Sequence, residues 1–565
     1  MSGPVKVDVL VVGSGAAGLS AAVTAAMHGA SVMVAEKASV LGGTSAWSGG
    51  WLWIPRNPLA RAEGIDEAAD TPLTYLQHEM GGEAADIRLQ TFLRYGPEMV
   101  EFFHQRTAVQ FLSGSAMPDF HPSPGAANGG RSVTAHPYDG RLLGDWLHRL
   151  RPPLETISLG GMGIAGGADM AHFFNATRSP RSALYAARRL LRHGWQRLRA
   201  GRGQHLVNGN ALVARLLRSA LDAGVRFQLN APVVRLLQGP PGMSGAVLRS
   251  DGGEIHVEAG AVVLACGGFP HDRQRLAQVV PHAAEGYGHF SAAPPDNQGE
   301  GIRLGESVGG QFDTSLRHPL AWAPVSRVTL ASGQQLMFPH LVERAKPGVI
   351  AVLPNGKRFV NEADSYHDFI AALLAATPAG DTPQAWLLAD RRTLRRYGLG
   401  HARPFPFTPT AWLRTGYLQR GNTLAELAKQ CAIDANALAE TVERFNHFAS
   451  TGEDVDFHRG ASAYNRAQGD HQVTLGPLRE GPFYAVRILP GSLGTFSGLQ
   501  TDEHARVLDE QQQPIPGLYA IGNDMSSVMR GYYPSGGITL GPAMTFGYLV
   551  GKNLAKKTNI NNNIT

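Results

Sequence analysis

The glycines at residues 13–18 have the types and spacing needed to bind phosphate groups. The run reads Gly13-Ser14-Gly15-Ala16-Ala17-Gly18, and an acid, Glu36, follows 18 residues after the last glycine. In this pattern the first glycine permits a tight turn, the second lets backbone approach a pyrophosphate, and the third lets a helix pack closely on a strand. The amides at the helix N-terminus then face the phosphates. Glu36 is placed to accept hydrogen bonds from ribose hydroxyls, so the sequence predicts dinucleotide binding.

The elements around this run are those that the motif requires. Residues 7–12 form an almost wholly apolar run, which is typical of a parallel strand buried on both faces. Residues 19–28 are rich in alanine and predict a helix, and residues 31–35 predict a second strand. We therefore expect Ala16, Ala17 and Lys37, which flank these elements, to contact the cofactor together with the glycines and Glu36.

A second glycine-rich segment, residues 41–50, indicates which dinucleotide is bound. A Gly-Gly-Thr-Ser turn and a Ser-Gly-Gly turn lie within ten residues. Small residues let the backbone lie flat against a bulky planar ligand, and the hydroxyls can reach phosphate or ring nitrogens. The segment favours a flavin, so FAD is expected rather than NAD. The expected contacts are Gly43, Thr44, Ser45, Ser48, Gly49 and Gly50.

Three later segments are predicted to supply further strands and a helix to the same domain. Residues 257–266 predict a strand that runs into Gly267, and residues 515–521 predict another that ends at Gly522 and Asn523. Residues 536–547, which include Thr539 and Leu540, predict a glycine-rich turn and a helix whose N-terminus can stabilise negative charge on a reduced flavin. The predicted fold class is α/β. A Rossmann-like FAD-binding domain is assembled from both chain ends (residues 1–274 and 480–565), and an α+β substrate domain is inserted at residues 275–479.

The composition excludes several other classes of protein. Of the 565 residues 43% are hydrophobic and 17% charged, which is a globular composition. The net charge of +5 is too dilute to indicate nucleic acid as a partner. Two cysteines, Cys266 and Cys431, cannot build a disulfide framework, and no His/Asp/Glu spacing suggests a metal. No apolar run reaches the roughly 18–20 residues of a membrane span, and no signal peptide is apparent, so a cytoplasmic location is expected.

With these parts in order, nearly the whole chain resembles the fumarate reductase/succinate dehydrogenase flavoprotein superfamily. Within it, the chain is most similar to the FAD-dependent 3-ketosteroid dehydrogenases of the Δ1 type. The segments that carry the resemblance are residues 42–50, 118–122, 356–366, 481–485, 517–523 and 533–546. The resemblance implies desaturation next to the 3-keto group of a steroid, with a proton going to a tyrosine and a hydride to flavin N5.

The resemblance also implies catalytic roles for particular residues. Tyr533 and the backbone amide of Gly537 match the pair that binds the ketone oxygen, and Tyr366 matches the tyrosine that takes the α-proton. In the family a further tyrosine assists this base. Phe120 stands in its place here, in the substrate pocket, and lacks the hydroxyl. Ser535 makes a Tyr-x-Ser pattern that is similar to the Δ4-(5α)-ketosteroid dehydrogenases, so Δ4 chemistry stays an alternative.

The residues weigh against a dicarboxylate substrate. Arginine is the usual clamp for a carboxylate because its fork matches the two oxygens. The stretches that carry His and Arg in fumarate reductases, here residues 494–499 and 532–537, contain neither, and Arg530 is not at the family's position. A small hydrophobic ketone is therefore the expected substrate, with an external electron acceptor. An ene-reductase acting on a neutral substrate stays open as a second alternative.

A basic segment at residues 178–202 lies within the first part of the FAD-binding domain. It holds eight arginines and no acid, interleaved with leucines, a tyrosine and a tryptophan. Such a segment can lie on an anionic membrane surface. The alternative is a solvated helix with one packed apolar side. A peripheral membrane contact is thus one possible partner interaction for the protein.

Overall fold

The computed structural model describes residues 4–240 and 242–562. Its first sheet is built on the N-terminal unit predicted from the sequence: β1 (Val5–Val12), α1 (Ala16–Met27) and β2 (Val32–Ala35). β1 pairs in parallel with β2 on one side and with β11 (Gly253–Leu264) on the other. The strands are apolar and buried toward their carboxyl ends, at residues 9–12, 32–35 and 261–264, where both faces of the sheet are covered.

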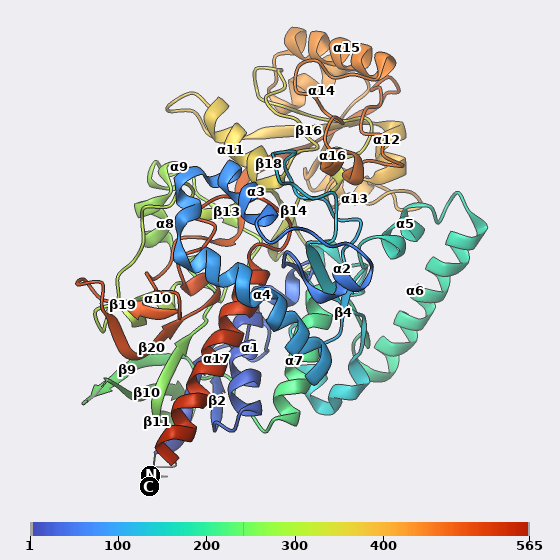
Figure 1. Ribbon diagram of the computed structural model, residues 1–565. Helices are drawn as coiled ribbons and strands as arrows, with labels where there is room; N and C mark the ends of the chain where they lie inside the picture. The colour runs from blue at the N-terminus through green and yellow to red at the C-terminus, as the bar shows by residue number, and fades with distance from the viewer. Residues whose placement is uncertain (1–3, 241, 563–565) are drawn as a thin grey trace.

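Strands from both ends of the chain meet in this sheet. Its order is β19 (Arg506–Leu508), β20 (Pro514–Ala520), β11, β1, β2 and β8 (Arg226–Gln228), and the hairpin of β9 (Val233–Gly239) and β10 (Gly242–Ser250) extends from β11. The last helix, α17 (Leu540–Asn562), packs along α1, and α7 (Asn208–Asp222) packs on the same helix. N- and C-terminal segments are therefore neighbours at the bottom of Figure 1.

A second sheet of seven strands contains the middle of the chain. Its order is β14 (Gln335–Pro339), β13 (Leu320–Thr329), β18 (Phe483–Thr495), β16 (Ala385–Asp390) and β15 (Val349–Val352), with β12 (Phe290–Ser291) and β17 (Leu418–Gly421) also paired to β18. Helices α14 (Leu424–Cys431) and α15 (Ala435–Thr451) cover it. β18 follows the expected domain boundary at residue 480 but belongs to this second sheet, because it pairs with both β13 and β16. The division into two domains stays a prediction.

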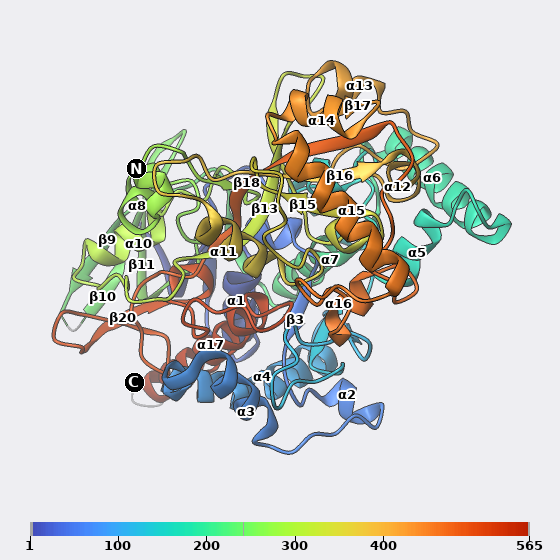
Figure 2. The same cartoon turned by 90° about the horizontal axis from the view of Figure 1, so that it is seen from above.

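The segment between β2 and β8 surrounds the first sheet with shorter elements. A small sheet is formed by β3 (Trp51–Trp53), β5 (Ser132–Ala135) and β4 (Phe111–Ser113), and α3 (Thr71–Met80) and α4 (Ile87–Arg106) lie beside it. Helices α5 (Ala168–Phe174) and α6 (Pro180–Ala200) extend to one edge of the molecule, as Figure 2 shows. No helix in the described ranges is long and apolar enough to cross a bilayer.

Candidate active site

A cavity of about 1380 Å³ lies between the glycine-rich turns of the first sheet and residues of the second. A pocket for one small ligand measures roughly 300–1,000 Å³, so this one has room for a dinucleotide and a substrate together. The cofactor residues expected from the sequence that line it are Gly13, Gly15, Ala16, Ala17, Glu36, Lys37, Gly43, Thr44, Ser45, Ser48, Gly49, Gly50, Gly267, Gly522, Asn523, Thr539 and Leu540. Gly18 does not line the cavity.

The three glycines of the first turn have distinct environments. Gly13 has a φ of +108°, and a Cβ on it would lie 2.2 Å from the carbonyl oxygen of Ala265. A Cβ on Gly18 would lie 2.1 Å from the oxygen of Gly13, so this glycine serves the packing of helix on strand. A Cβ on Gly15 would meet only the Ser45 hydroxyl, at 3.5 Å. The space that a side chain would fill at Gly15 therefore belongs to the cavity and fits a pyrophosphate.

Polar side chains around the turn hold its shape. Glu36 accepts hydrogen bonds from the hydroxyl of Ser14 at 2.6 Å and from the amide of Ala38 at 2.9 Å. The Ser45 hydroxyl accepts from the first amide of α1, that of Ala16, at 3.0 Å. Lys37 forms a salt bridge of 2.5 Å with Glu300. These contacts orient the carboxylate of Glu36 and the N-terminus of α1 at the cavity wall.

Two buried polar residues beside these turns, of which Asn297 lines the cavity and Asp524 does not, were missed by the sequence analysis. Asn297 donates to the Thr44 hydroxyl at 2.9 Å and to the Gly267 carbonyl at 3.1 Å, and it lines the cavity. Asp524 is buried and accepts from the amides of Cys266, at 2.5 Å, and Gly268, at 3.0 Å. Burial raises the pKa of Asp524 to about 6. Asp524 could have been found from the sequence, because it follows Gly522 and Asn523 directly after a predicted strand. Asn297 lies in no motif.

At the other end of the cavity, two tyrosines form a direct hydrogen bond. Tyr366 is the first residue of α11 (Tyr366–Ala376), and its hydroxyl donates to that of Tyr533 at 2.7 Å. Burial, together with the hydrogen bond that its hydroxyl donates to Tyr533, raises the pKa of Tyr366 well above its usual value. Burial also raises the pKa of Tyr533 to about 12. Both phenols line the cavity and are neutral at ordinary pH, and the Tyr533 proton is free to reach a third group.

Phe120 packs against both tyrosines. Its ring stacks on that of Tyr533 with the centroids 5.7 Å apart, and it meets the Tyr366 ring edge-on at 5.6 Å. The Phe120 amide donates to the carbonyl of Pro534 at 3.0 Å, and the buried Tyr75 hydroxyl donates to the same oxygen at 2.6 Å. These two bonds fix the loop that carries Tyr533. Phe120 lines the cavity beside the two tyrosines.

A third phenol, Tyr464 of α16 (Ala463–Gln468), also faces this part of the cavity. Its ring lies 4.5 Å from that of Phe120. Its hydroxyl makes no hydrogen bond to any residue that the structure describes, and burial raises its pKa. No sequence signal pointed to Tyr464, because it is distant along the chain from the other site residues and stands in no recognisable motif.

Gly537 and Ser535 lie in the same loop but differ in exposure to the cavity. Gly537 has a φ of +103°, and its carbonyl accepts from the Trp53 and Gly541 amides at 3.1 and 2.9 Å. Its own N–H donates to no acceptor among residues 4–240 and 242–562, and the residue lines the cavity. Ser535 is buried and is not part of the cavity wall.

The rings that pack directly on the tyrosine pair, those of Phe120, His367 and Phe496, are uncharged. His367 lies with its ring 5.5 Å from that of Tyr533, and burial lowers its pKa to about 3, so it is neutral. Arg530 is held in salt bridges with Asp313 at 2.6 Å and Glu83 at 2.8 Å. No three His, Cys, Asp or Glu side chains converge as a metal site in the described ranges. This end of the cavity suits a neutral ring that carries a carbonyl.

His121 links the Phe120 segment to α11. Its Nδ1 lies 2.5 Å from a Glu79 oxygen and its Nε2 lies 2.7 Å from an Asp368 oxygen. Burial alone would lower the pKa of His121, but the two carboxylates outweigh it and raise the pKa to about 10. The protonated imidazole thus holds α3, the Phe120 segment and α11 together, and it has no free nitrogen for chemistry.

The Gly13 turn, the open space at Gly15 and the large two-part cavity define a dinucleotide-binding flavoprotein. The chain belongs to the family described as FAD binding domain, which it matches over residues 8–540, and it is an FAD-dependent oxidoreductase. It is 39% identical over 558 residues to 4-oxocyclohex-2-ene-1-carboxylate 5-dehydrogenase of Sinomonas cyclohexanicum, covering 97% of this chain and 94% of that one. It is 36% identical to 3-oxosteroid 1-dehydrogenase of Mycolicibacterium smegmatis, covering 97% of each.

A solved structure gives a similar result. The 3-ketosteroid Δ1-dehydrogenase of Sterolibacterium denitrificans, in complex with 1,4-androstadiene-3,17-dione, superposes with a TM-score of 0.88 at 36% identity, covering 98% of this chain and all of that one. The 3-ketosteroid Δ4-(5α)-dehydrogenase of Rhodococcus jostii gives a TM-score of 0.63 at 22% identity, which shows a shared fold. The sequence-based expectations of FAD and of a ketosteroid dehydrogenase family are confirmed at this level.

Proposed function

We propose that the protein desaturates the ring next to the 3-keto group of a steroid, at the Δ1 position. The observation that carries this proposal is that the hydrogen-bonded pair of Tyr366 and Tyr533 lines the same cavity as Gly537, whose N–H has no acceptor among the described residues. Dehydrogenation beside a ketone requires a base for the α-proton and donors to the carbonyl oxygen, on which enolate charge develops. These three groups can meet both requirements.

In the proposed mechanism the ketone oxygen accepts hydrogen bonds from the Tyr533 hydroxyl and the Gly537 N–H. Tyr366 donates to Tyr533, which orients the Tyr533 proton away from Tyr366 and toward the substrate. Tyr366 takes the α-proton in the fraction of molecules whose Tyr366 hydroxyl has already released its own proton to solvent. Burial raises the pKa of Tyr366, so this ionised fraction is small at neutral pH. The Gly13 turn and its neighbours would hold FAD, which would supply the hydride acceptor when bound.

Two features support the Δ1 position over Δ4. The relatives at 36% identity are named for the 1-position. The Δ4 alternative rests on a hydroxyl at Ser535, which lies outside the cavity wall. Phe120 fills space beside the tyrosine pair without supplying a hydroxyl, so the base acts here without a tyrosine at that position.

A monocyclic keto acid is the second candidate substrate, because the relative at 39% identity is named for one. Its carboxylate would need a cation in the cavity. Arg151 is paired with Asp296 at 2.5 Å. Lys346 donates to the carbonyls of Gln468 and Gly469 at 2.6 and 2.7 Å, and burial lowers its pKa to about 8. Two further cations line the cavity: Lys37 is paired with Glu300, and Arg403 donates to the carbonyl of Ser158. All four cations have partners already, which favours the neutral, larger substrate.

Anaerobic bleaching of the flavin, followed by identification of the product, tests the proposal. The panel contains saturated and Δ4 3-ketosteroids and 4-oxocyclohexanecarboxylates. We expect bleaching by 3-ketosteroids with a new double bond at position 1. A Tyr366→Phe variant is the control for chemistry at this site, and Lys346→Met is the control for carboxylate binding. Bleaching by the keto acids alone, with loss in Lys346→Met, would establish the second candidate instead.

A further inference from the structure

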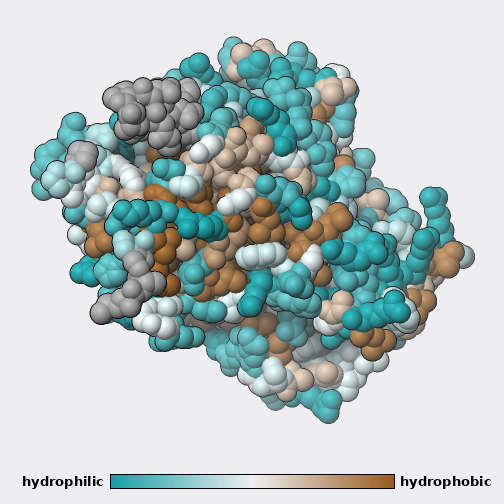
Figure 3. Space-filling view, turned by 90° about the horizontal axis from the view of Figure 1, so that it is seen from below, coloured by the Kyte–Doolittle hydropathy of each residue, from teal (hydrophilic) through white to brown (hydrophobic). Residues whose placement is uncertain are grey.

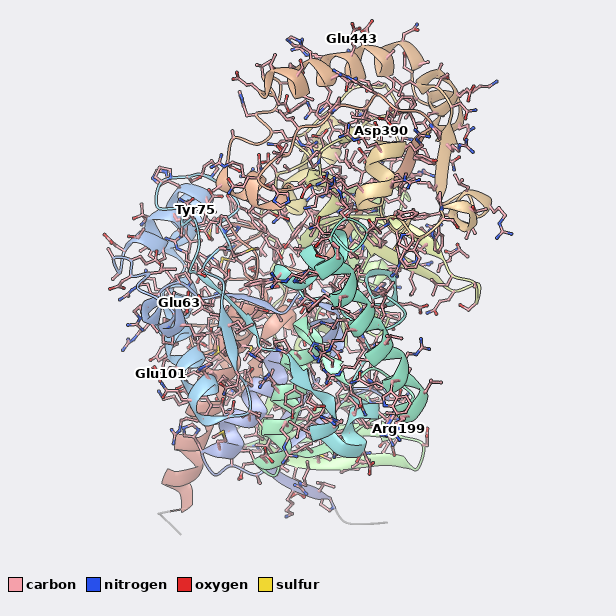
Figure 4. All side chains as sticks on the ribbon, turned by 90° about the vertical axis from the view of Figure 1, so that its right-hand side faces the viewer. Glu63, Tyr75, Glu101, Arg199, Asp390 and Glu443 are labelled. Carbon is pink, nitrogen blue, oxygen red and sulfur yellow. The ribbon has the colours of Figure 1, made fainter. Side chains whose placement is uncertain are left out.

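A second, smaller cavity lies beside the turn that leads into α2 (Pro58–Ala62), and α3 and α4 complete its wall. Its volume is about 360 Å³, within the roughly 300–1,000 Å³ of a site for one small ligand. It shares no lining residue with the candidate active site. Figure 4 shows this side of the molecule at its left, where Glu63, Tyr75 and Glu101 are labelled. The cavity is therefore a separate candidate binding site.

Arginines supply all the charged groups that line this cavity. Arg56, Arg61 and Arg94 belong to its wall, and no acidic residue does. In the described part of the chain, none of the three guanidinium groups makes a hydrogen bond or a salt bridge. Arg94 makes one ring contact, with its guanidinium carbon 5.3 Å from the centroid of the Tyr95 ring. Three positive charges thus face one small space without a counter-charge in its wall.

Acids in the flanking segments do not pair with these arginines. Glu98, one turn beyond Arg94 on α4, accepts from the Tyr548 hydroxyl at 2.7 Å and forms a salt bridge with Lys552. Glu67 is bound to Arg131 at 2.6 Å. The other acids of the turn between α2 and α3 are exposed and lie outside the cavity wall: Glu63, Asp66 and Asp70. The positive charge of the cavity is therefore left for a ligand.

Arg56 has the least satisfied side chain of the three arginines. Its Nε is buried and has no hydrogen-bond partner. Arg151, Arg275 and Arg459 also have a buried Nε without a partner, but each forms a salt bridge through a terminal nitrogen, at 2.5, 2.6 and 3.0 Å. Arg56 forms no such bridge within residues 4–240 and 242–562. Because an unpaired buried charged donor costs free energy, an acceptor in the cavity would stabilise this side chain.

The backbone at Arg56 is also strained. Its φ of +58° lies in the left-handed region, which residues other than glycine adopt uncommonly. The next residue fixes the turn, because the buried Asn57 side chain donates to the carbonyls of Ile54, at 3.0 Å, and Gly130, at 2.8 Å. The same side chain accepts from the amide of Ala60 at 3.0 Å. Strained residues of this kind concentrate at ligand sites, and this turn holds Arg56 at the cavity despite the backbone cost.

The rest of the wall contains a backbone carbonyl without its usual donor. Pro97 lies inside α4 and has no N–H, so it cannot donate to the carbonyl of Leu93 one turn earlier. Both residues line the cavity, and no residue outside α4 donates to this carbonyl in the described ranges. The remaining wall is apolar, formed by Pro55, Ala69 and Pro72. The lining residues thus combine cationic donors, an under-used carbonyl and apolar side chains.

Single arginines on a protein surface are ordinary, since water solvates them. Hydrophilic side chains cover much of the face shown in Figure 3. The Arg56 cavity differs from such a surface in three respects. Its charges converge on one cavity, a buried nitrogen has no partner, and the turn that presents this nitrogen is strained.

We propose that this cavity binds a small molecule through a phosphate group. Guanidinium groups bind phosphate oxygens through parallel pairs of hydrogen bonds, and three of them suit a group that carries two negative charges. The apolar walls would contact the organic part of the ligand. The proposal is independent of the dehydrogenation proposed above, because this cavity is separate from the one that would hold FAD.

Calorimetric titration of the FAD-loaded protein with inorganic phosphate tests the proposal, with acetate at the same ionic strength as the comparison. We expect saturable binding of phosphate, and acetate should bind about tenfold or more weakly because it carries a single charge. Each arginine contributes a charged hydrogen bond worth about tenfold in affinity, so Arg61→Gln/Arg94→Gln should bind phosphate on the order of 100-fold more weakly. The matched variant Arg249→Gln/Arg273→Gln changes two exposed arginines elsewhere and should bind as wild type.

Arg56→Gly separates ligand binding from a purely structural role of this residue. Glycine adopts a left-handed φ without strain, so the variant should unfold at or above the wild-type temperature in phosphate-free buffer. It should also lose phosphate binding, because the buried donor is gone. An arginine that served only the fold would give the opposite result, with a lower unfolding temperature and unchanged phosphate binding.

Three results would each overturn the proposal: no saturable binding of phosphate, acetate bound as tightly as phosphate, or phosphate binding that Arg56→Gly and Arg61→Gln/Arg94→Gln leave intact. Flavin absorbance checks that every variant retains FAD. Flavin reduction by a 3-ketosteroid in phosphate-free buffer should proceed at the wild-type rate in all of them. Phosphate binding without reduction by any ketone would support this site and refute only the proposed reaction.

Discussion

Replacing Tyr533 by phenylalanine removes one hydroxyl from the centre of the proposed site. In the structure this hydroxyl accepts the 2.7 Å hydrogen bond from Tyr366 and leaves its own proton free for a ketone oxygen. The ring itself would stay, because it stacks on Phe120 and contacts His367 and Phe496. The substitution therefore deletes a donor without opening a cavity in the packing.

Two separate losses are expected from Tyr533→Phe. Losing one donor to a developing oxyanion typically slows turnover by about 10²–10³, or 3–4 kcal/mol, because the bond strengthens as charge develops. Part of the bond is already formed in the ground state, so ligand affinity should fall by about tenfold. The Tyr366 hydroxyl also loses its acceptor, which should lower the free energy of unfolding by about 1 kcal/mol.

Stopped-flow reduction of the flavin measures the first loss, and titration of the oxidised enzyme with a product ketone measures the second. Tyr366→Phe is the matched variant. It should lose about 10²–10⁴ in the rate of reduction, because the base is gone, and should bind the ketone nearly as wild type. The double variant should lose less than the sum, since the two hydroxyls share one hydrogen bond. Wild-type reduction by either single variant would refute the assigned roles.

Four further predictions follow from particular residues. Gly15→Val should give a folded protein that no longer retains FAD, because its side chain would enter the cavity. Gly13→Ala should unfold, because its Cβ would meet the backbone at Ala265. Flavin absorbance measures the first effect and thermal unfolding the second. Phe120→Tyr should raise the rate of proton abstraction, seen as faster flavin reduction; an unchanged or slower rate would contradict this. The reduction rate should rise with pH, because the raised pKa of Tyr366 leaves little phenolate at neutral pH, and Tyr366→Phe should abolish this rise. Because the pKa of His121 is raised to about 10 in the folded protein, its charged form stabilises the fold fully below pH about 6.5. This contribution to the free energy of unfolding, on the order of 1–3 kcal/mol, should disappear as the pH rises to about 10. Denaturant unfolding should show this pH-dependent loss in wild type and no such loss in His121→Gln, which lacks the contribution at every pH.

The parts of the molecule that sequence could predict are those with local signals. The Gly13 turn, the strands around it and the glycine-rich segment at residues 41–50 follow from spacing and from the sharp preference of tight turns for glycine. Tyr366 and Tyr533 were found through the resemblance of the surrounding segments to a family. Their direct contact could not be predicted, because it joins positions 167 residues apart.

The parts that sequence missed depend on long-range packing. Asn297 and Tyr464 reach the cavity from segments without periodicity or motif, and only the fold places them there. Residues 480–565 were assigned to the FAD-binding domain, which stays a prediction; the pairing of β18 within the second sheet was not foreseen. Pairing partners of a buried apolar strand are set by register across the sheet, and nothing in the strand's own composition specifies them.

The position of β18 late in the chain has a consequence for how the protein is made. This strand of 13 residues is the partner of β13, β16, β17 and β12, and none of these strands can complete its sheet without it. The first sheet likewise awaits β20, and α1 awaits α17. During synthesis, the strands within the first 480 or so residues therefore keep unpaired edges until the final segment leaves the ribosome. Nascent chains should engage chaperones until synthesis ends, and a truncation before residue 483 should leave both sheets unable to close.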